Sequence, residues 1–244
     1  MSDAIYAQQW TSDNHSEYKR DTLPFSQRFI HRLGVEGRAG YIFQTNPFLE
    51  YSNHQYKAMK NTYAGHLEYS FQFRPHTVAD QAYIGAYQGI GVGYFNFGNP
   101  EELGNPLAVY LFQGGRIAQF SPRISLNYEW NFGASFGWKP YDDYDNPENQ
   151  IIGSKVNAYL NVNFYLKWAL SRKFDLMIGA TGSHFSNGNT QYPNSGLNTV
   201  DCKVGLAYNL NRRADELAQS WQRPIVPPFP RHVSYDLTLF GSWR

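Results

Sequence analysis

A histidine and a serine stand two residues apart at the end of an apolar, strand-like run. His184 and Ser186 belong to the segment "KFDLMIGATGSHFSN", which continues into a loop rich in glycine and asparagine. Residues i and i+2 of a strand share one face, so an imidazole would lie beside a hydroxyl group. A serine next to a histidine that a third group orients is the arrangement of serine esterases. The pair therefore indicates nucleophilic acyl transfer.

The parity of the neighbouring apolar residues predicts the side of the sheet on which this pair lies. His184 and Ser186 have even numbers, and so do the apolar residues of the same run: Phe174, Leu176, Ile178 and Ala180. In the next run Asn198 is even as well, together with Val200, Val204, Leu206 and Tyr208. We therefore expect three polar side chains to converge on an apolar wall near its rim. A polar group facing hydrocarbon without a partner is costly, so the alternative is a location at headgroup depth.

Alternation of apolar and polar residues recurs along most of the chain and predicts strands. The segments "HLEYSFQF", "RISLNYEWNF" and "KVNAYLNVNFYLKW" each have one apolar and one polar face. Several predicted strands exceed the roughly 5 to 6 residues of globular strands and match the roughly 9 to 11 of membrane-spanning strands. We predict eight strands, near residues 31–43, 62–74, 83–95, 106–115, 122–137, 153–170, 174–186 and 198–210.

The connections and the aromatic content favour a membrane barrel over a soluble one. Longer or more polar connections follow the first, third, fifth and seventh predicted strands, and mostly shorter ones lie between, which is the outer-membrane pattern. Aromatic residues make up 17% of the chain, as expected where rings anchor a barrel at the membrane interface. We predict an all-β fold, an antiparallel transmembrane β-barrel of about eight strands with a C-terminal extension. A soluble barrel or sandwich would show the same alternation with its apolar face inside.

The chain divides into three parts. These are an N-terminal segment (1–29), the barrel (30–210) and a C-terminal extension (211–244). The extension begins with helix-compatible residues and a proline cluster, which predict a linker. Its last segment, "VSYDLTLFGSW", predicts a possible ninth strand, although bacterial single-chain barrels have even strand numbers.

Composition excludes several other classes. The net charge is +1 with mixed signs, so we expect no nucleic-acid partner. The single cysteine, Cys202, rules out an internal disulfide and fits as a small apolar filler. No apolar run reaches the roughly 18 residues of a membrane helix. The amino terminus lacks a secretory-signal pattern, so either the protein stays inside the cell or the sequence is a mature form with an added start.

The segment "HFSNGNTQYPNSGLN", residues 184–198, resembles the signature of the outer-membrane lipid A 3-O-deacylases and their acyloxyacyl-hydrolase-like relatives. The resemblance implies an eight-stranded barrel in the bacterial outer membrane whose active site faces lipid. It implies His184 as the base and Ser186 as the nucleophile. It further implies Asn187 as an oxyanion donor, and it matches the family's PN pair with Pro193 and Asn194. Nearby backbone N–H groups, such as that of Gly188, are expected to help hold the oxyanion. The implied substrate is lipid A of lipopolysaccharide.

One position departs from the family pattern. The third triad member of the best-known deacylases is a glutamate, and the residue that matches it by spacing is Asn198. An amide oxygen can accept the imidazole N–H and fix its tautomer, but it supplies no negative charge to stabilise an imidazolium ion. We therefore predict Asn198 as the third catalytic residue, with reduced activity or a different orienting residue as the alternatives.

Other candidate motifs predict no cofactor. The histidines show no zinc-ligand spacing, and "DDYDNPEN" lacks the spacing of a calcium loop. The glycine-dense "GIGVGYFNFG" does not fit a dinucleotide fingerprint and is expected to ease strand curvature or lumen packing. Glu36, Glu68 and Glu129 are expected to face the lumen. We expect neither a metal nor an organic cofactor.

Two non-enzymatic interpretations remain beside the esterase. The first is an outer-membrane barrel with a structural or lipid-binding role, which would keep the His-Phe-Ser-Asn segment for its loop shape. The second is a soluble lipid-binding barrel, which would fold without detergent.

Overall fold

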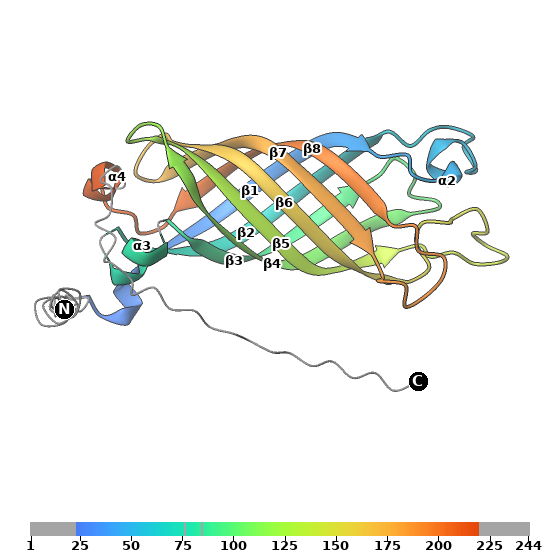
Figure 1. Cartoon of the computed structure of the whole chain (residues 1–244), viewed down its shortest axis with the longest axis horizontal. Coiled ribbons are helices and arrows are strands. Elements are labelled where there is room, and N and C mark those ends of the chain that lie inside the picture. Colours follow the sequence, from blue (N-terminus) through green and yellow to red (C-terminus); the bar gives the residue numbers. More distant parts are fainter. Residues whose placement is uncertain (1–22, 76, 84, 220–244) are drawn as a thin grey trace, which may run out of the picture.

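The computed structural model describes residues 23–75, 77–83 and 85–219. Eight antiparallel strands pair in chain order, and β8 pairs with β1 to close a barrel (Figure 1). The predicted fold class is confirmed. The strands are β1 (Phe29–Ile42), β2 (Asn61–Phe73), β3 (Tyr87–Asn96), β4 (Gly104–Gln119), β5 (Ile124–Trp138), β6 (Val156–Ala169), β7 (Phe174–Ser186) and β8 (Leu197–Asn209).

Most predicted strand ends lie within three residues of the observed ones, but two strands differ by four residues at one end. The third was expected to begin at residue 83, but β3 begins at Tyr87 because the preceding residues form the helix α3 (Val78–Tyr83). The connection before β3 is therefore longer than the short turn expected there. The fourth was expected to end at residue 115, yet β4 continues to Gln119 through an irregularity between Arg116 and Ala118. Such an irregularity absorbs an extra residue without ending the strand pairing.

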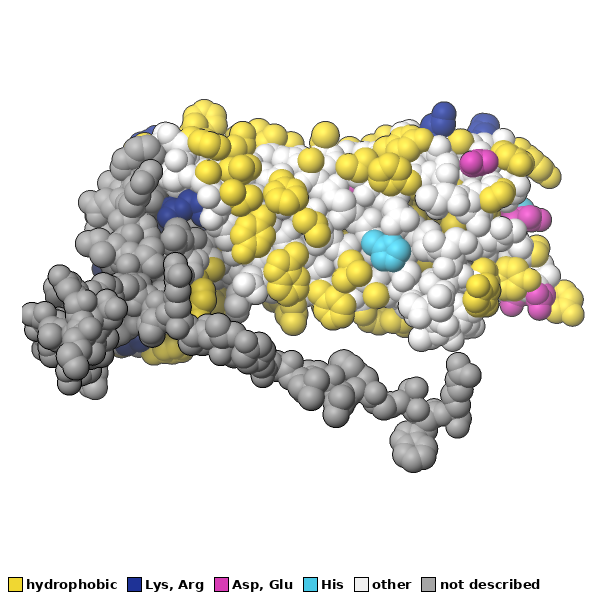
Figure 2. Space-filling view, viewed as in Figure 1, with side chains coloured by type: hydrophobic (Ala, Val, Ile, Leu, Met, Phe, Trp, Pro, Cys, Tyr) yellow, Lys and Arg dark blue, Asp and Glu magenta, His cyan; other side chains and the backbone are white. Residues whose placement is uncertain are grey.

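The two faces of the barrel wall differ in polarity. Outward side chains of β6 such as Val162 and Phe164 are about half exposed, whereas the inward Asn161 and Asn163 are buried. Hydrophobic side chains spread along the wall, and acidic ones gather at the end formed by the longer loops (Figure 2). An apolar wall around a polar lumen is the arrangement of an outer-membrane barrel, because a soluble barrel would place its apolar face inside.

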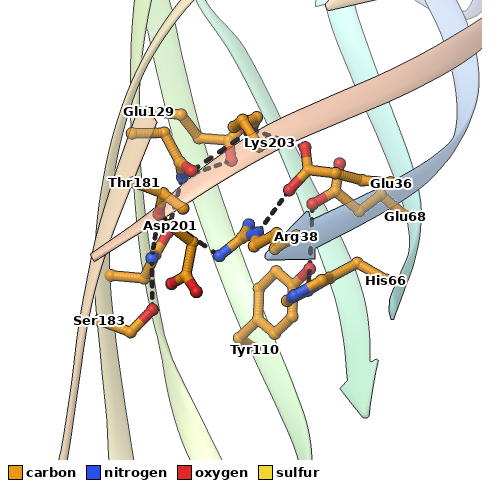
Figure 3. Close-up of polar contacts among 12 residues, drawn as sticks. Glu36, Arg38, His66, Glu68, Tyr110, Glu129, Thr181, Ser183, Asp201 and Lys203 are labelled. Atoms are coloured by element: carbon orange, nitrogen blue, oxygen red, sulfur yellow. Dashed lines mark hydrogen bonds and ion pairs between the residues drawn. The ribbon is translucent and has the colours of Figure 1, made fainter. Parts of the chain in front are cut away.

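A cluster of paired charges fills the middle of the lumen. Glu36 contacts Arg38 at 2.5 Å and Lys203 at 2.6 Å, and these side chains point toward one another (Figure 3). Glu68 accepts a hydrogen bond from the Tyr110 hydroxyl at 2.9 Å. Glu129, the third carboxylate expected in the lumen, is buried there and accepts hydrogen bonds from Tyr87 and Asn163.

The glycines of β3 make room for aromatic rings in the lumen. A Cβ atom on Gly91 would lie 2.4 Å from the Tyr110 ring, and one on Gly89 would lie 2.4 Å from the Phe112 ring. The glycine-dense segment therefore serves lumen packing, which was one of the two roles expected for it.

The loop cap is a group of buried apolar residues at the end of the barrel that carries the longer loops. It includes α2 (Pro47–Glu50) and packs against inward residues of β7 and β8. Backbone hydrogen bonds tie the β7–β8 loop to it: Ser195 N donates to Gln150 O, and Gly196 N donates to Ile151 O. The residues of the loop cap are Phe48, Leu49, Phe97, Leu103, Ile151 and Ile152.

The opposite end carries the short turns, η1 (Phe25–Gln27), α3 and α4 (Asp215–Gln219) (Figure 1). Arg74 pairs with Glu216 of α4 at 2.6 Å, and Arg212 pairs with Asp175 at 2.8 Å. These ion pairs fasten the start of the predicted extension to the barrel. The possible ninth strand, residues 233–243, lies outside the described residues. Among the residues described, no helix is long and apolar enough to cross a membrane.

We predict that Glu36→Gln destabilises the barrel. Removing this carboxylate leaves Arg38 and Lys203 buried without their counter-charge, and breaking a buried ion pair costs about 3–5 kcal/mol. The urea midpoint of the detergent-refolded protein, followed by its shift in gel mobility on unfolding, should fall. Glu148→Gln, on an exposed loop, is the control and should leave the midpoint unchanged. Equal midpoints for both variants would contradict the prediction.

Candidate active site

The pairing of β7 with β8 places His184 directly opposite Asn198. Both residues lie on the outer wall, and both are partly buried. The Nδ1 atom of His184 lies 2.7 Å from the Oδ1 atom of Asn198. An amide oxygen can only accept a hydrogen bond, so Nδ1 carries the proton. The tautomer left by this contact has a basic Nε2, which is the nitrogen a general base needs.

Ser186 ends β7 on the same outer side, and both side chains lie beside Gly196. A Cβ atom on this glycine would be 3.1 Å from Cε1 of His184 and 3.7 Å from Cβ of Ser186. Its φ is +71°, a conformation that suits glycine. Gly196 is a site residue that the sequence prediction missed. Its signal is the turn-forming "NSG" immediately before β8.

The turn after Ser186 is held by two asparagines. The backbone N–H of Asn187 donates to Oδ1 of Asn194 at 3.0 Å, and Nδ2 of Asn187 donates to Gln191 O at 2.7 Å. The backbone N–H of Gly188 points back at the Ser186 Oγ atom, 3.3 Å away. The turn therefore aims the Gly188 N–H at the serine, while Asn187 and Asn194 fix the loop's shape.

An open groove of about 760 Å³ leads away from Ser186 along the outer wall. Its floor follows one cross-strand row, because Ser186 pairs with Ala158, Ala158 pairs with Ala134, and Ala134 pairs with Val109. Small side chains in this row leave the wall hollow between larger neighbours, which include Leu160, Phe132 and Leu111. The groove is apolar and opens where lipid chains surround the barrel.

The structure also places the single cysteine. Cys202 is exposed on the outer wall, as its parity indicated. Within the described ranges, no group of three or more His, Cys, Asp or Glu side chains is placed to hold a metal ion.

The barrel and the polar constellation on its wall together define a class. This is an outer-membrane β-barrel with a candidate ester-hydrolase site open to the lipid side. The profile of the family described as lipid A 3-O-deacylase (PagL) matches residues 31–207. The chain belongs to this family, and the protein is an outer-membrane lipid A 3-O-deacylase. The predicted family, hydrolase activity and outer-membrane location are thereby confirmed.

Solved structures of other outer-membrane barrels resemble the chain in fold. Neisserial surface protein A has 9% sequence identity and a TM-score of 0.44, covering 75% of this chain and 96% of that one. The outer membrane enzyme PagL has 14% identity and a TM-score of 0.42, covering 70% and 97%. The N-terminal barrel domain of Pseudomonas aeruginosa OprF has 10% identity and a TM-score of 0.40, covering 73% and 97%. No curated protein sequence matches the chain significantly.

We predict that Gly196→Ala lowers the rate of lipid A deacylation. The methyl group would crowd His184 and Ser186, and a non-glycine residue at this φ costs roughly 1–2 kcal/mol. Gly98→Ala is a matched control, because Gly98 also has a positive φ, +78°, but a Cβ there would meet nothing within 4 Å. Both variants should lose similar stability, and only Gly196→Ala should lose activity on purified lipid A, measured by mass spectrometry. Equal activity of the two variants would exclude a role for this close approach.

Proposed function

We propose that Ser186, His184 and Asn198 carry out the deacylation as nucleophile, general base and orienting residue. The observation that supports this assignment best is the 2.7 Å contact between His184 Nδ1 and Asn198 Oδ1, on the same outer face as Ser186. A site on this face receives its lipid sideways from the leaflet. A site in the lumen would have to extract the acyl chain from the membrane first.

The proposed reaction has two acyl-transfer steps. In the first, Nε2 of His184 takes the proton of the Ser186 hydroxyl as Oγ attacks the ester carbonyl carbon at the 3-position of lipid A. The tetrahedral intermediate collapses when the sugar oxygen leaves with the proton from His184. In the second, His184 removes a proton from water, which attacks the acyl-serine ester and releases the fatty acid. His184 returns its proton to Ser186.

The oxyanion of each intermediate needs hydrogen-bond donors near Ser186. The Gly188 N–H, 3.3 Å from Oγ, is the backbone donor best placed for this role. Asn187 was predicted as a donor from the family resemblance. One of its amide hydrogens is engaged by Gln191 O, so we assign the other N–H of Nδ2 as the second donor. Asn194 positions both donors through its contact with Asn187 N. Donors of this kind contribute about 10²–10³-fold to the rate.

The orienting residue of the proposed triad, Asn198, is an uncharged amide rather than a carboxylate. In a serine protease, replacing the triad aspartate by asparagine costs about 10⁴-fold because the amide presents the wrong tautomer. Here Oδ1 faces Nδ1, so the tautomer is the productive one. What the site lacks, relative to a carboxylate, is the charge that stabilises the imidazolium ion.

Ser186→Ala and His184→Ala should each lower lipid A deacylation by about 10³-fold or more. Ser183→Ala is the matched control, since this serine lies on the same strand but faces the lumen, where its Oγ accepts from Asn161 at 2.8 Å. Mass spectrometry of lipid A incubated with each variant gives the rate of loss of the 3-hydroxyacyl chain. A Ser186→Ala protein with wild-type activity would reject the nucleophile assignment.

Asn198→Asp should raise kcat, because a carboxylate of nearly the same shape would stabilise the imidazolium ion. Asn198→Leu should lower kcat by about 10²-fold, because the imidazole loses its fixed orientation. Rates on detergent-dispersed lipid A at neutral pH test both expectations. Equal rates for the wild-type protein and both variants would show that Asn198 does not orient the base.

The apolar groove supports the acyl-chain part of the proposal. Ala134 lies two strand spacings from Ser186, about 10 Å along the groove. Ala134→Phe should therefore shift the preference toward shorter acyl chains, measured by comparing lipid A species that differ in the length of the 3-O-acyl group. Ala180→Phe, on the outer face of β7 and outside the groove, is the control. An unchanged chain preference in Ala134→Phe would mean that the chain does not lie here.

A further inference from the structure

A pair of glutamines interrupts the apolar wall far from Ser186. Gln88 on β3 and Gln113 on β4 are direct cross-strand partners. Each has the parity of the outward residues on its strand, which include Ile90 and Leu111. Gln88 is exposed and Gln113 is half-buried. Two neighbouring amide side chains therefore face the lipid side of the barrel.

Neither glutamine side chain has a hydrogen-bond partner among the described residues. An amide that lies in an apolar environment without a hydrogen bond raises the free energy of the folded protein, and two such amides raise it further. At the candidate active site, by contrast, His184 and Asn198 on the outer wall are hydrogen-bonded to each other. The glutamine pair lacks such an arrangement within the part of the chain that the structure describes, so its amides are available to a ligand in the membrane.

The glutamines separate two apolar cavities in the wall. One has a volume of about 390 Å³ and is lined by Tyr69, Ile90, Leu111 and Trp130, among others. The second, of about 280 Å³, is lined by Phe73, Tyr83 and Ala86, among others. Both Gln88 and Gln113 border both cavities. Concave apolar surfaces with a few well-placed polar groups are typical of ligand sites.

The pair lies toward the end of the barrel opposite to Ser186. Gln88 is the second residue of β3, and its partner on β2, Phe71, lies two residues before the end of that strand. Ser186, by contrast, ends β7 at the rim that carries the longer loops. Because the longer loops of such barrels are extracellular, the glutamines lie in the periplasmic half of the wall. They belong to a surface distinct from the candidate active site.

We propose that Gln88 and Gln113 bind the ester carbonyl groups of a glycerophospholipid in the periplasmic leaflet, with its acyl chains in the two cavities. Glutamine amides donate through Nε2, and an ester carbonyl oxygen is an acceptor at the depth where chains meet the glycerol backbone. Among the described residues, no charged side chain lines either cavity, so the phosphate is not the group recognised. A second copy of the chain fits less well, because two hollow surfaces facing each other would leave a void. The proposal does not depend on which residues cleave lipid A.

The test compares a diacyl phosphatidylethanolamine with its dialkyl ether analogue, which has the same chains and headgroup but no carbonyl groups. Native mass spectrometry of the full chain in detergent counts the intact lipid that remains bound. The wild-type protein should retain the diacyl lipid about tenfold more strongly than the ether, since two hydrogen bonds are at stake. The Gln88→Leu/Gln113→Leu double variant should bind both lipids equally weakly. It should keep its lipid A deacylation.

Gln55→Leu, in an exposed loop at the other end, is the matched control and should behave as wild type. Equal retention of the two lipids by the wild-type protein would overturn the proposal without any variant being needed. A double variant that keeps the preference for the diacyl lipid would also overturn it. If the wild-type protein is a dimer that the double variant converts to a monomer, a second copy covers the surface and the proposal is wrong.

Discussion

The buried ion pairs that Glu36 makes with Arg38 and Lys203 are the interaction on which the rest of the structure depends. Glu36 and Arg38 belong to β1, and Lys203 belongs to β8, so the Glu36–Lys203 contact at 2.6 Å crosses the seam that closes the barrel. Strand register has a period of two, and a slip by one residue would turn every side chain of β8 to the other face. Burying charges is costly unless each has its partner, so this cluster tolerates only one register.

The register of β8 in turn determines the candidate active site. With Lys203 in the lumen, Asn198 must face outward, and the pairing with β7 brings it opposite His184. The loop cap then sets the path of the chain between the two strands through the hydrogen bonds of Ser195 and Gly196 to the β5–β6 loop. The charge cluster in the lumen thus influences the candidate active site on the outer wall without contacting it. Its role is to determine which face each side chain of β8 occupies.

The space that small residues leave on the barrel wall is used differently on the inner face and on the outer face. Inside, the glycines of β3 leave space that Tyr110 and Phe112 fill, so the lumen is packed. Outside, Ala134 and Ala158 leave space that no side chain of the described residues fills, so the wall is grooved beside Ser186. The glutamine pair adds polarity to a second hollow region in the other half of the wall. The interior of an eight-stranded barrel is about wide enough for side chains to fill, and both hollow regions described above lie on the outer wall.

Much of the fold could be predicted from the sequence, because alternation is a local property. The period-two pattern located eight strands, and parity alone placed His184, Ser186 and Asn198 on one apolar face. The beginning of β3 was mispredicted, since Tyr83, the expected first residue of this strand, ends the helix α3 and the strand begins only at Tyr87. Similarity of residues 184–198 to a known signature identified the family, which periodicity could not have done.

Only the tertiary structure decided which residues meet across strands and loops. The contact of His184 with Asn198, the position of Gly196 beside the pair, and the row from Ser186 to Val109 all depend on register, which links residues from separate strands. The engagement of Asn187 with Gln191 and Asn194 depends on the shape of a loop that packs against others. Alternation is written into each strand separately, because a side chain's face follows from its backbone. Contacts between strands are set by closing the barrel and pairing its buried charges, which no single segment contains.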